Sequence, residues 1–592
     1  MSGNPLRFLV VSALATLALV VAACGGSSNS SSSSKTTTKS SAAAGDTPTT
    51  AGKKGGKLTM LAASDVDYLD PGHTYYTAGE QVDGAMGRTL YTIGPSDPGK
   101  TIPDIAQGDP QISADKKTVT VTLKKGIKFS PPVNREVTSK DIKYAFERFF
   151  SVNVGGQYAS YFPIVGAPKA PTKGVKTISG ITTPDDSTVV FKLQQPVAVS
   201  FAAALVMPIT TPVPKEYASK FDAKNPSTYN THVVATGPYM VKNDAQGNTV
   251  GYKAGKSIDL VRNPNWDPKT DDRPGYLDEI FIRTNASDPN VSARQVLDGQ
   301  NMILDTNPPA NILKELVTKI KDQYTTVPSG GYRYFPMNTT IKPFDNVDVR
   351  RAVIAGFDRN AARLARGGKF VGDIPTHFLP PDFPGFNEAG GYKGPGFDFL
   401  KNESGDMNLA AQYMKKAGYP SGKYTGKEQF LMVGANADPG KAQAEVAAAQ
   451  FQKLGFNMKL RLVPQDAVYT EWCQVPDKKV AVCGGAGWFK DFIDPQSMLE
   501  PTFAGYTIAK GGGNNNLAQL NDPKVDAAMK AASLLEGDAR NKAWGEIDKM
   551  ITNDAPAVPF VWDKTTLVRS KNVNGVPNPY LALWDFTYTS IK

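Results

Sequence analysis

Apolar and polar positions along the chain predict a succession of strands and helices. Residues 118–123 (TVTVTL) and 188–193 (TVVFKL) are rich in strand-forming side chains, and residues 457–463 (NMKLRLV) alternate apolar and polar positions. Each segment is therefore expected to lie in a sheet. Because the elements follow one another without a fixed period, the pattern predicts α/β or α+β lobes and not an array of repeats.

Capping residues mark the beginnings of several helices. Thr138 and Asp141 have the spacing of a capping box and precede an apolar stripe at helical spacing, which predicts a helix ending near Phe150. Three further aspartates precede expected helices: Asp406, Asp494 and Asp522. The apolar stretch 196–214 contains four prolines and is expected to pack in a core instead of crossing a membrane.

The first 56 residues predict export and attachment to a membrane. Arg7 precedes an uncharged apolar run that is short for a membrane span, so residues 1–23 are expected to be a signal peptide. Ala22 and Ala23 before Cys24 resemble the lipobox of bacterial lipoproteins, which implies cleavage before Cys24 and lipid, including an acyl chain such as palmitate, at this residue. The alternative is a secreted protein with an unmodified cysteine. Residues 24–56 are Ser/Thr-rich and are expected to form a flexible tether.

Composition narrows the classes of partner. With 592 residues, 40% of them hydrophobic, the chain can bury a large core and is expected to fold as more than one lobe. Its formal charge of +10 is distributed without a long Lys/Arg block, which favours a solvated basic surface over a nucleic-acid partner. Cys473 and Cys483 can pair as a disulfide in an exported protein, or remain two separate thiols. No metal-ligand spacing is present, and no cofactor or metal is expected.

Motifs for catalysis are sparse. The stretch GPSDPGKT (94–101) matches the letters of a phosphate-binding loop, but Pro95 and Pro98 remove backbone donors and no long helix is expected after Thr101. The stretch is therefore interpreted as a surface turn. The three histidines are scattered and no nucleophile elbow occurs, so an enzyme is not expected.

A series of phrases in order resembles the extracellular solute-binding proteins of family 5, the peptide and oligopeptide receptors of ABC importers. They extend through nearly the whole mature chain and include YLDPGHTYYTAG (68–79), IDLVRNPNW (258–266), FPMNTTIKPFDNVDVRRAVIAGFDR (335–359) and GWFKDFIDP (487–495). The resemblance implies an α/β, two-lobed periplasmic-binding-protein-like fold of type II, similar to cluster C, with an extra subdomain in the first lobe. The expected lobes are 57–330, with the subdomain at about 100–235, and 331–562, while 563–592 return to the first lobe.

The resemblance also implies residues of a binding site. In peptide-binding relatives, the aspartate three residues after the tryptophan of GWFKDFIDP binds the α-amino group of the peptide, and here these residues are Asp491 and Trp488. The alternative for Asp491 is a surface or turn-capping acid. Tyr75, Tyr76 and Thr77 match a segment that borders the cleft in relatives, with loop packing as the alternative. No Arg or Lys is carried over as a partner for a peptide carboxylate.

The implied function is a monomeric lipid-anchored receptor on the extracytoplasmic face of the cell membrane. It is expected to close its lobes around a short peptide and to deliver it to the permease subunits of an ABC importer. The alternatives are a receptor for a nickel complex, an oligosaccharide or another small molecule, a cell-surface hydrolase, and a structural or adhesive lipoprotein.

Overall fold

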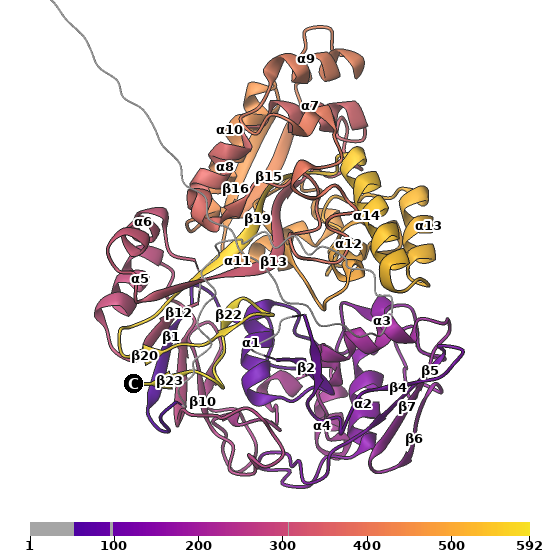
Figure 1. Ribbon diagram of the computed structural model, residues 1–592, viewed down its shortest axis with the longest axis vertical. Coiled ribbons are helices and arrows are strands. Elements are labelled where there is room, and N and C mark those ends of the chain that lie inside the picture. The colour runs from indigo at the N-terminus through magenta and orange to yellow at the C-terminus, as the bar shows by residue number, and fades with distance from the viewer. Residues whose placement is uncertain (1–51, 95–98, 306) are drawn as a thin grey trace, which may run out of the picture. The chain divides into compact units, whose positions relative to one another are not determined.

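The computed structural model describes residues 52–94, 99–305 and 307–592 (Figure 1). These residues belong to one compact unit, Gly45–Lys592. The expected signal peptide, Cys24 and most of the expected tether lie outside the described residues. Gly55 and Gly56, at the end of that tether, already bond to the fold, because their amides donate to the Tyr276 carbonyl (2.8 Å) and the Asp278 carboxylate (3.0 Å). Within the described part of the chain, no helix is long and apolar enough to cross a membrane.

The sheet of the first lobe combines early and later parts of the chain. Its strand order is β12-β1-β11-β10-β8, with β9 paired to β10. The strands are β1 (Lys57–Leu61), β8 (Tyr239–Val241), β9 (Tyr252–Lys253), β10 (Ser257–Arg262), β11 (Glu279–Arg283) and β12 (Met302–Leu304). Leu58 and Ile258 share a core with Val573, Trp584 and Phe586, so residues near the C-terminus pack with this first sheet. The first lobe also contains helices α1 (Thr77–Met86), α5 (Pro289–Asp298) and α6 (Ala310–Thr318).

A second, antiparallel sheet has its own core. Its order is β4-β5-β7-β6, formed by β4 (Gln111–Ile112), β5 (Thr118–Thr122), β6 (Ile181–Asp185) and β7 (Thr188–Lys192). Val119 and Val121 of β5 are buried, because alternate side chains of a strand point to the same face. They pack with α2 (Ser139–Phe149), where Thr138 and Asp141 form the predicted capping box. Helix α3 (Ala198–Ala203) packs in the same core through Ala198 and Phe201, whereas Ala218 of α4 (Lys215–Asp222) lies in the core of the first sheet.

Two long paired strands connect the two lobes (Figure 1). β13 (Tyr324–Pro336) and β19 (Ala557–Val568) pair antiparallel in a sheet of order β14-β19-β13-β18. β13 contributes Val327 to the core of the first lobe and Phe335 to a core of the second, and Leu567 and Phe560 of β19 do the same. The other strands of this sheet are β14 (Gly372–Asp373) and β18 (Ala486–Phe489).

The second lobe also contains a three-stranded parallel sheet. Its order is β16-β15-β17, with β15 (Gln429–Ala435), β16 (Asn457–Val463) and β17 (Val482–Gly484). The helices of this lobe are α7 (Val347–Gly356), α8 (Arg359–Arg366), α9 (Met407–Lys416), α10 (Gly440–Lys453), α11 (Gln465–Ala467), α12 (Pro495–Phe503), α13 (Pro523–Ala532) and α14 (Gly537–Asp554). Asp406, Asp494 and Asp522 accept hydrogen bonds from backbone amides in the first turns of α9, α12 and α13, which confirms the predicted caps.

The remaining strands are short. β20 (Val573–Asn574) pairs with β23 (Ser590–Ile591), and β21 (Pro577–Asn578) pairs with β22 (Leu583–Trp584). β2 (Tyr91–Ile93) ends just before GPSDPGKT, and β3 (Thr101–Pro103) begins at its last residue. The two strands form an antiparallel pair in which Ile93 lies opposite Thr101. Pro95 and Pro98 lie outside the described residues. Since a strand and not a helix begins at Thr101, the helix that a phosphate-binding loop requires is not formed there.

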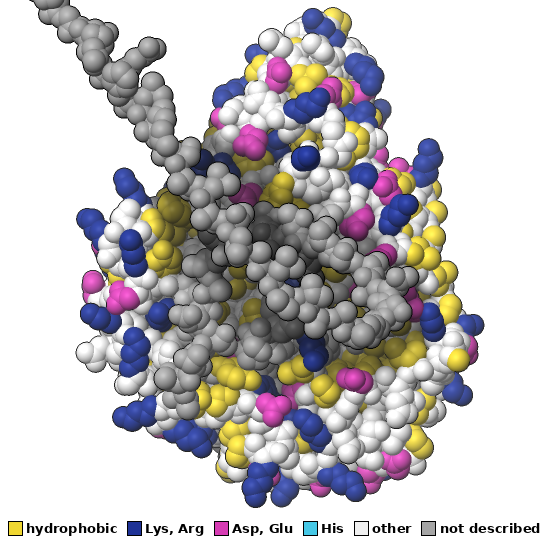
Figure 2. Space-filling model, in the orientation of Figure 1, with side chains coloured by type: hydrophobic (Ala, Val, Ile, Leu, Met, Phe, Trp, Pro, Cys, Tyr) yellow, Lys and Arg dark blue, Asp and Glu magenta, His cyan; other side chains and the backbone are white. Residues whose placement is uncertain are grey.

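Charged side chains are dispersed over the surface. Figure 2 shows Lys and Arg across the visible face, with Asp and Glu between them. This arrangement agrees with the dispersed charge of the sequence, which predicted a solvated basic surface.

Candidate functional site

All five residues predicted to bind ligand line one cavity of about 360 Å³. Tyr75, Tyr76 and Thr77 come from the loop before α1 and its first turn, whereas Trp488 and Asp491 come from β18 and the loop that follows it. The fold therefore brings together two segments that are more than 400 residues apart. Direct contact of these side chains with a ligand stays a prediction.

The loop before α1 is held by one half-buried aspartate. The Asp67 carboxylate accepts hydrogen bonds from the Thr74 hydroxyl (2.7 Å) and from the backbone amides of Tyr75 (2.6 Å) and Tyr76 (3.1 Å). Burial raises the pKa of Asp67 to about 6, although these hydrogen bonds oppose the shift. A Cβ on Gly79 would lie 2.1 Å from the Thr74 hydroxyl oxygen, so the close packing of α1 on this loop requires glycine there.

Asp491 is a buried acid surrounded by tyrosines. Its side chain accepts hydrogen bonds from the hydroxyls of Tyr75 (2.7 Å) and Tyr161 (2.6 Å), both at Oδ2, and its backbone carbonyl accepts one from the Tyr580 hydroxyl. Burial raises the pKa of Asp491 to about 7, while the two tyrosine hydrogen bonds partly oppose the shift. Asp494 caps α12 instead. A carboxylate that is 8% exposed and has no bound cation among the described residues is suited to a cationic group of a ligand.

Aromatic rings form the wall beside Asp491. The Tyr75 ring lies 4.8 Å from that of Tyr158 and 6.0 Å, edge to face, from that of Trp488. The Trp488 indole nitrogen donates to the Ser497 carbonyl at 2.8 Å, so this interaction fixes the indole and leaves its carbon surface for the cavity. Aromatic faces attract cations, and the wall therefore has the same preference as the carboxylate.

The cationic side chains of the cavity are already bonded within the protein. Arg333 donates to the buried carboxylate of Asp563 at 2.8 Å, and Arg366 donates to it through two nitrogens at 2.7 and 2.6 Å. The Lys490 ammonium donates to the carbonyls of Ser329 (3.2 Å) and Tyr580 (2.8 Å), and burial lowers its pKa to about 8.

Several lining or supporting residues were not predicted from the sequence. They are Glu80, Tyr161, Arg333, Arg366, Gln443, Lys490 and Tyr580. Lys490 directly precedes Asp491 in the sequence, so it could have been predicted as a site residue from its position. Tyr161 and Tyr580 are 330 and 89 residues from Asp491, and no local pattern links them to it.

A disulfide joins two segments whose neighbouring residues line the cavity. The sulfurs of Cys473 and Cys483 are bonded, and the next residue after the first cysteine, Gln474, lines the cavity together with Gly485. The described residues contain no cluster of His, Cys, Asp or Glu that could hold a metal ion.

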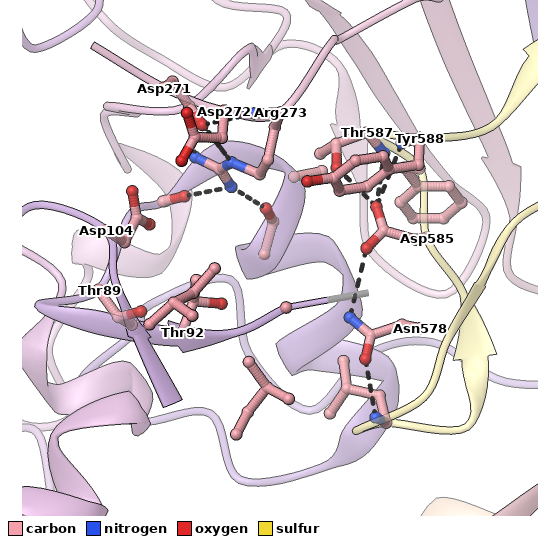
Figure 3. A pocket seen from close by; sticks show the side chains of 18 of the residues that line it. Thr89, Thr92, Asp104, Asp271, Asp272, Arg273, Asn578, Asp585, Thr587 and Tyr588 are labelled. Carbon is pink, nitrogen blue, oxygen red and sulfur yellow. Dashed lines mark hydrogen bonds and ion pairs between the residues drawn. The ribbon is translucent and has the colours of Figure 1, made fainter. Parts of the chain in front are cut away.

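A second, smaller cavity of about 110 Å³ lies between the C-terminal end of α1 and the C-terminal segment (Figure 3). Arg273 in its wall pairs with Asp271 at 2.8 Å and donates to the Gly84 carbonyl, and Asp585 accepts from the Thr587 hydroxyl. These polar groups are satisfied by one another, and none of the five predicted site residues lines this cavity. The larger cavity is therefore the better candidate for a ligand site.

The chain is similar to known bacterial solute-binding proteins. A family model described as bacterial extracellular solute-binding proteins, family 5 middle, matches residues 100–510. Heme-binding protein A of Haemophilus influenzae is 26% identical over 484 residues, covering 79% of this chain and 81% of that protein. The oligopeptide-binding protein OppA of Bacillus subtilis is 24% identical over 477 residues, with coverage of 79% and 81%.

A solved structure shows the same fold. The periplasmic binding protein DppA of Helicobacter pylori, in complex with the peptide STSA, superposes with a TM-score of 0.75 at 20% identity and covers 91% of this chain and 98% of that chain. The predicted two-lobed, type II periplasmic-binding-protein fold is thereby confirmed.

Proposed function

We propose, from the premise that this chain belongs to family 5 of the bacterial extracellular solute-binding proteins, that it is a receptor for short peptides of an ABC importer. The observation that carries the proposal is Asp491, a buried carboxylate in the wall of the cavity that bonds to tyrosine hydroxyls and to no cation of the described chain. In this proposal the α-ammonium of the peptide binds Asp491.

The chemistry of the Asp491 carboxylate suits an ammonium ion. Tyr75 and Tyr161 donate to the same oxygen, so the other oxygen, Oδ1, is not used by either. A charge-assisted hydrogen bond in an enclosed site contributes about 1.5–3 kcal/mol, or roughly ten- to a hundredfold in affinity. Tyr75 and Trp488 add aromatic surface around the same charge.

Other groups of the cavity suit a peptide backbone. β18 is an edge strand of its sheet, and Gly487, Trp488 and Phe489 of this strand line the cavity. An extended peptide can bind to such an edge through its main chain. Within residues 52–94, 99–305 and 307–592, the buried Gln443 side-chain nitrogen and the buried Tyr76 hydroxyl have no hydrogen-bond partner, so both can bond to a peptide carbonyl.

The remaining parts of the proposal concern attachment and transport. We place the lobes at 57–330, including the subdomain at about 100–235, and at 331–562, with the return at 563–592. Closure around the peptide produces the state that the permease subunits recognise. Cys24 carries the lipid that holds this monomeric receptor at the extracytoplasmic face of the membrane. The receptor performs no catalysis.

One relative is named for heme binding, which keeps a non-peptide solute as the alternative ligand. Heme carries two carboxylates of its own. The cavity is lined by six carboxylates and three cations, and those cations are already bonded within the protein. This balance favours a cationic ligand group over an anionic one.

The test compares trialanine with N-acetyl-trialanine by isothermal titration calorimetry. We expect wild type to bind the free amine at least tenfold more tightly, and Asp491→Asn to bind both peptides with similar, low affinity. Asp186→Asn, which changes an exposed carboxylate, serves as the control and should retain the preference. Equal affinity of wild type for the two peptides would contradict the proposal, and binding of heme but of neither peptide would replace it with the alternative.

A further inference from the structure

Glu80 is a second carboxylate at the Asp491 end of the cavity. It lies in the first turn of α1 and lines the cavity together with Asp491 and Tyr75. Its side chain has no hydrogen-bond or ion-pair partner among the described residues, whereas Asp491 has its two tyrosines. The two acids therefore differ, because one is already held in place and the other is unbonded.

The charges of Glu80 and Asp491 act on the same tyrosine side chains. Burial raises the pKa of Glu80 well above its usual range, and the charge of Asp491 is the next cause. Both carboxylates raise the pKa of Tyr75, Tyr158 and Tyr580, whose own burial is the main cause of the shift. Two carboxylates thus share one aromatic environment, and a single ammonium ion would neutralise only one of them.

The rest of the cavity supplies no compensating cation. Asp65 is bonded to the Tyr252 hydroxyl (3.2 Å) and the Gly255 amide (2.7 Å), but Asp305 and Asp466 resemble Glu80 in having no side-chain partner in the described chain. Lys490 directs its ammonium to two backbone carbonyls. A cationic partner that would hold Glu80 in its ionised form can therefore come only from a ligand, as far as the described residues show.

We infer that Glu80 makes this site selective for peptides whose first residue is lysine or arginine. The inference rests on the proposed function, because binding of the α-ammonium to Asp491 places the side chain of the first residue next to it. Both groups of such a residue branch from one α-carbon, so one residue supplies a charge to each carboxylate. The side chain of the second residue points to the opposite side of an extended peptide and is not next to Asp491.

The experiment uses two tripeptides of similar shape, Lys-Ala-Ala and norleucine-Ala-Ala, titrated into the full-length protein by calorimetry. We expect wild type to prefer the lysine peptide by about tenfold. Glu80→Gln should reduce this preference to less than about twofold, mainly through weaker binding of the lysine peptide. Asp466→Asn, which neutralises another unbonded carboxylate of the cavity, is the matched control and should retain most of the preference.

A second peptide pair locates the charge. Ala-Lys-Ala and Ala-norleucine-Ala should show a ratio of affinities that Glu80→Gln does not change. If Glu80→Gln lowers the lysine-to-norleucine affinity ratio more at the second residue than at the first, the assignment to the first residue is wrong. If Asp466→Asn removes the preference for Lys-Ala-Ala as fully as Glu80→Gln does, the assignment to Glu80 is wrong.

Wild type alone can also overturn the inference, so the outcome does not depend on how well a variant folds. If wild type binds norleucine-Ala-Ala more tightly than its N-acetyl form but does not prefer Lys-Ala-Ala, the inference fails and the proposed function stands. If acetylation has no effect, the proposed function itself fails.

Discussion

Two buried ionic clusters in this molecule differ in how their carboxylates are neutralised. In the first, Arg148 donates to both oxygens of Asp70 (2.6 and 2.7 Å) and to both oxygens of Asp222 (2.8 and 2.7 Å). In the second, Asp491 receives only tyrosine hydroxyls and Glu80 has no partner in the described chain. The first cluster is complete without a ligand, and the second is not.

The pKa values follow the same difference. Burial favours a raised pKa for Asp222, but hydrogen bonds and charge from Arg148 outweigh it and the pKa of Asp222 is lowered. Burial of Asp491 is opposed only by neutral hydroxyls, and its pKa rises to about 7. A buried carboxylate with its own cation depends on that cation for the stability of the fold, whereas one without a cation is a candidate for ligand binding.

The largest expected effect comes from removing the cation of the complete cluster. Arg148→Met leaves two buried carboxylates without a counter-charge, and we expect the free energy of unfolding to fall by about 3–5 kcal/mol. Urea unfolding followed by tryptophan fluorescence measures it. Lys140→Met, which breaks the exposed pair with Asp186, is the control and should change stability little. A similar small loss for both variants would contradict the structural role of Arg148.

The next effect is the pH dependence of ligand affinity. Binding of an ammonium requires ionised Asp491, whose pKa in the free protein is about 7. A peptide α-amine remains protonated below that pH, so affinity should fall by up to about tenfold for each pH unit from 7 to 5. Calorimetry with trialanine measures this slope. Other carboxylates with raised pKa values titrate in the same pH range, so the slope of affinity against pH in wild type is compared with that in Asp491→Asn. Equal slopes in the two proteins would count against Asp491.

Local patterns predicted the secondary structure because their causes are local. The capping box at Thr138 and the cap at Asp494 act within one helical turn, and strand-forming side chains identified β5 directly. The site could not be predicted from local patterns alone, because Tyr161 and Tyr580 are distant from Asp491 in the sequence and contact it only in the folded chain. Glu80 follows Thr77 by three residues, but its lack of a partner among the described residues becomes visible only when every neighbouring side chain is placed.

A smaller effect is expected when one hydroxyl is removed from Asp491. Tyr161→Phe removes a hydrogen bond of about 1.5 kcal/mol to the ionised carboxylate, so the pKa of Asp491 should rise further, by about one unit. The midpoint of the affinity–pH profile for trialanine should move up by the same amount. Tyr158→Phe is the matched control, because the Tyr158 hydroxyl accepts from the Ile209 amide and does not bond to Asp491. Equal shifts in both variants would mean that the hydrogen bond is not the cause.

The smallest expected effect is on the stability of Asp491→Asn, and it separates the two clusters most sharply. The pKa of Asp491 is higher in the folded state than in the unfolded chain, so the folded state binds the proton more tightly between about pH 4 and pH 7. The stability that this proton contributes is therefore lost as pH rises to 7, and at pH 8 the ionised carboxylate destabilises the fold. Asparagine retains an acceptor for both tyrosines without the charge. The free energy of unfolding at pH 8 should thus stay within about 1 kcal/mol of wild type or exceed it, whereas Arg148→Met loses several times as much. A loss in Asp491→Asn as large as that of Arg148→Met would show that the tyrosine-bound acid stabilises the fold in the same way as the complete cluster.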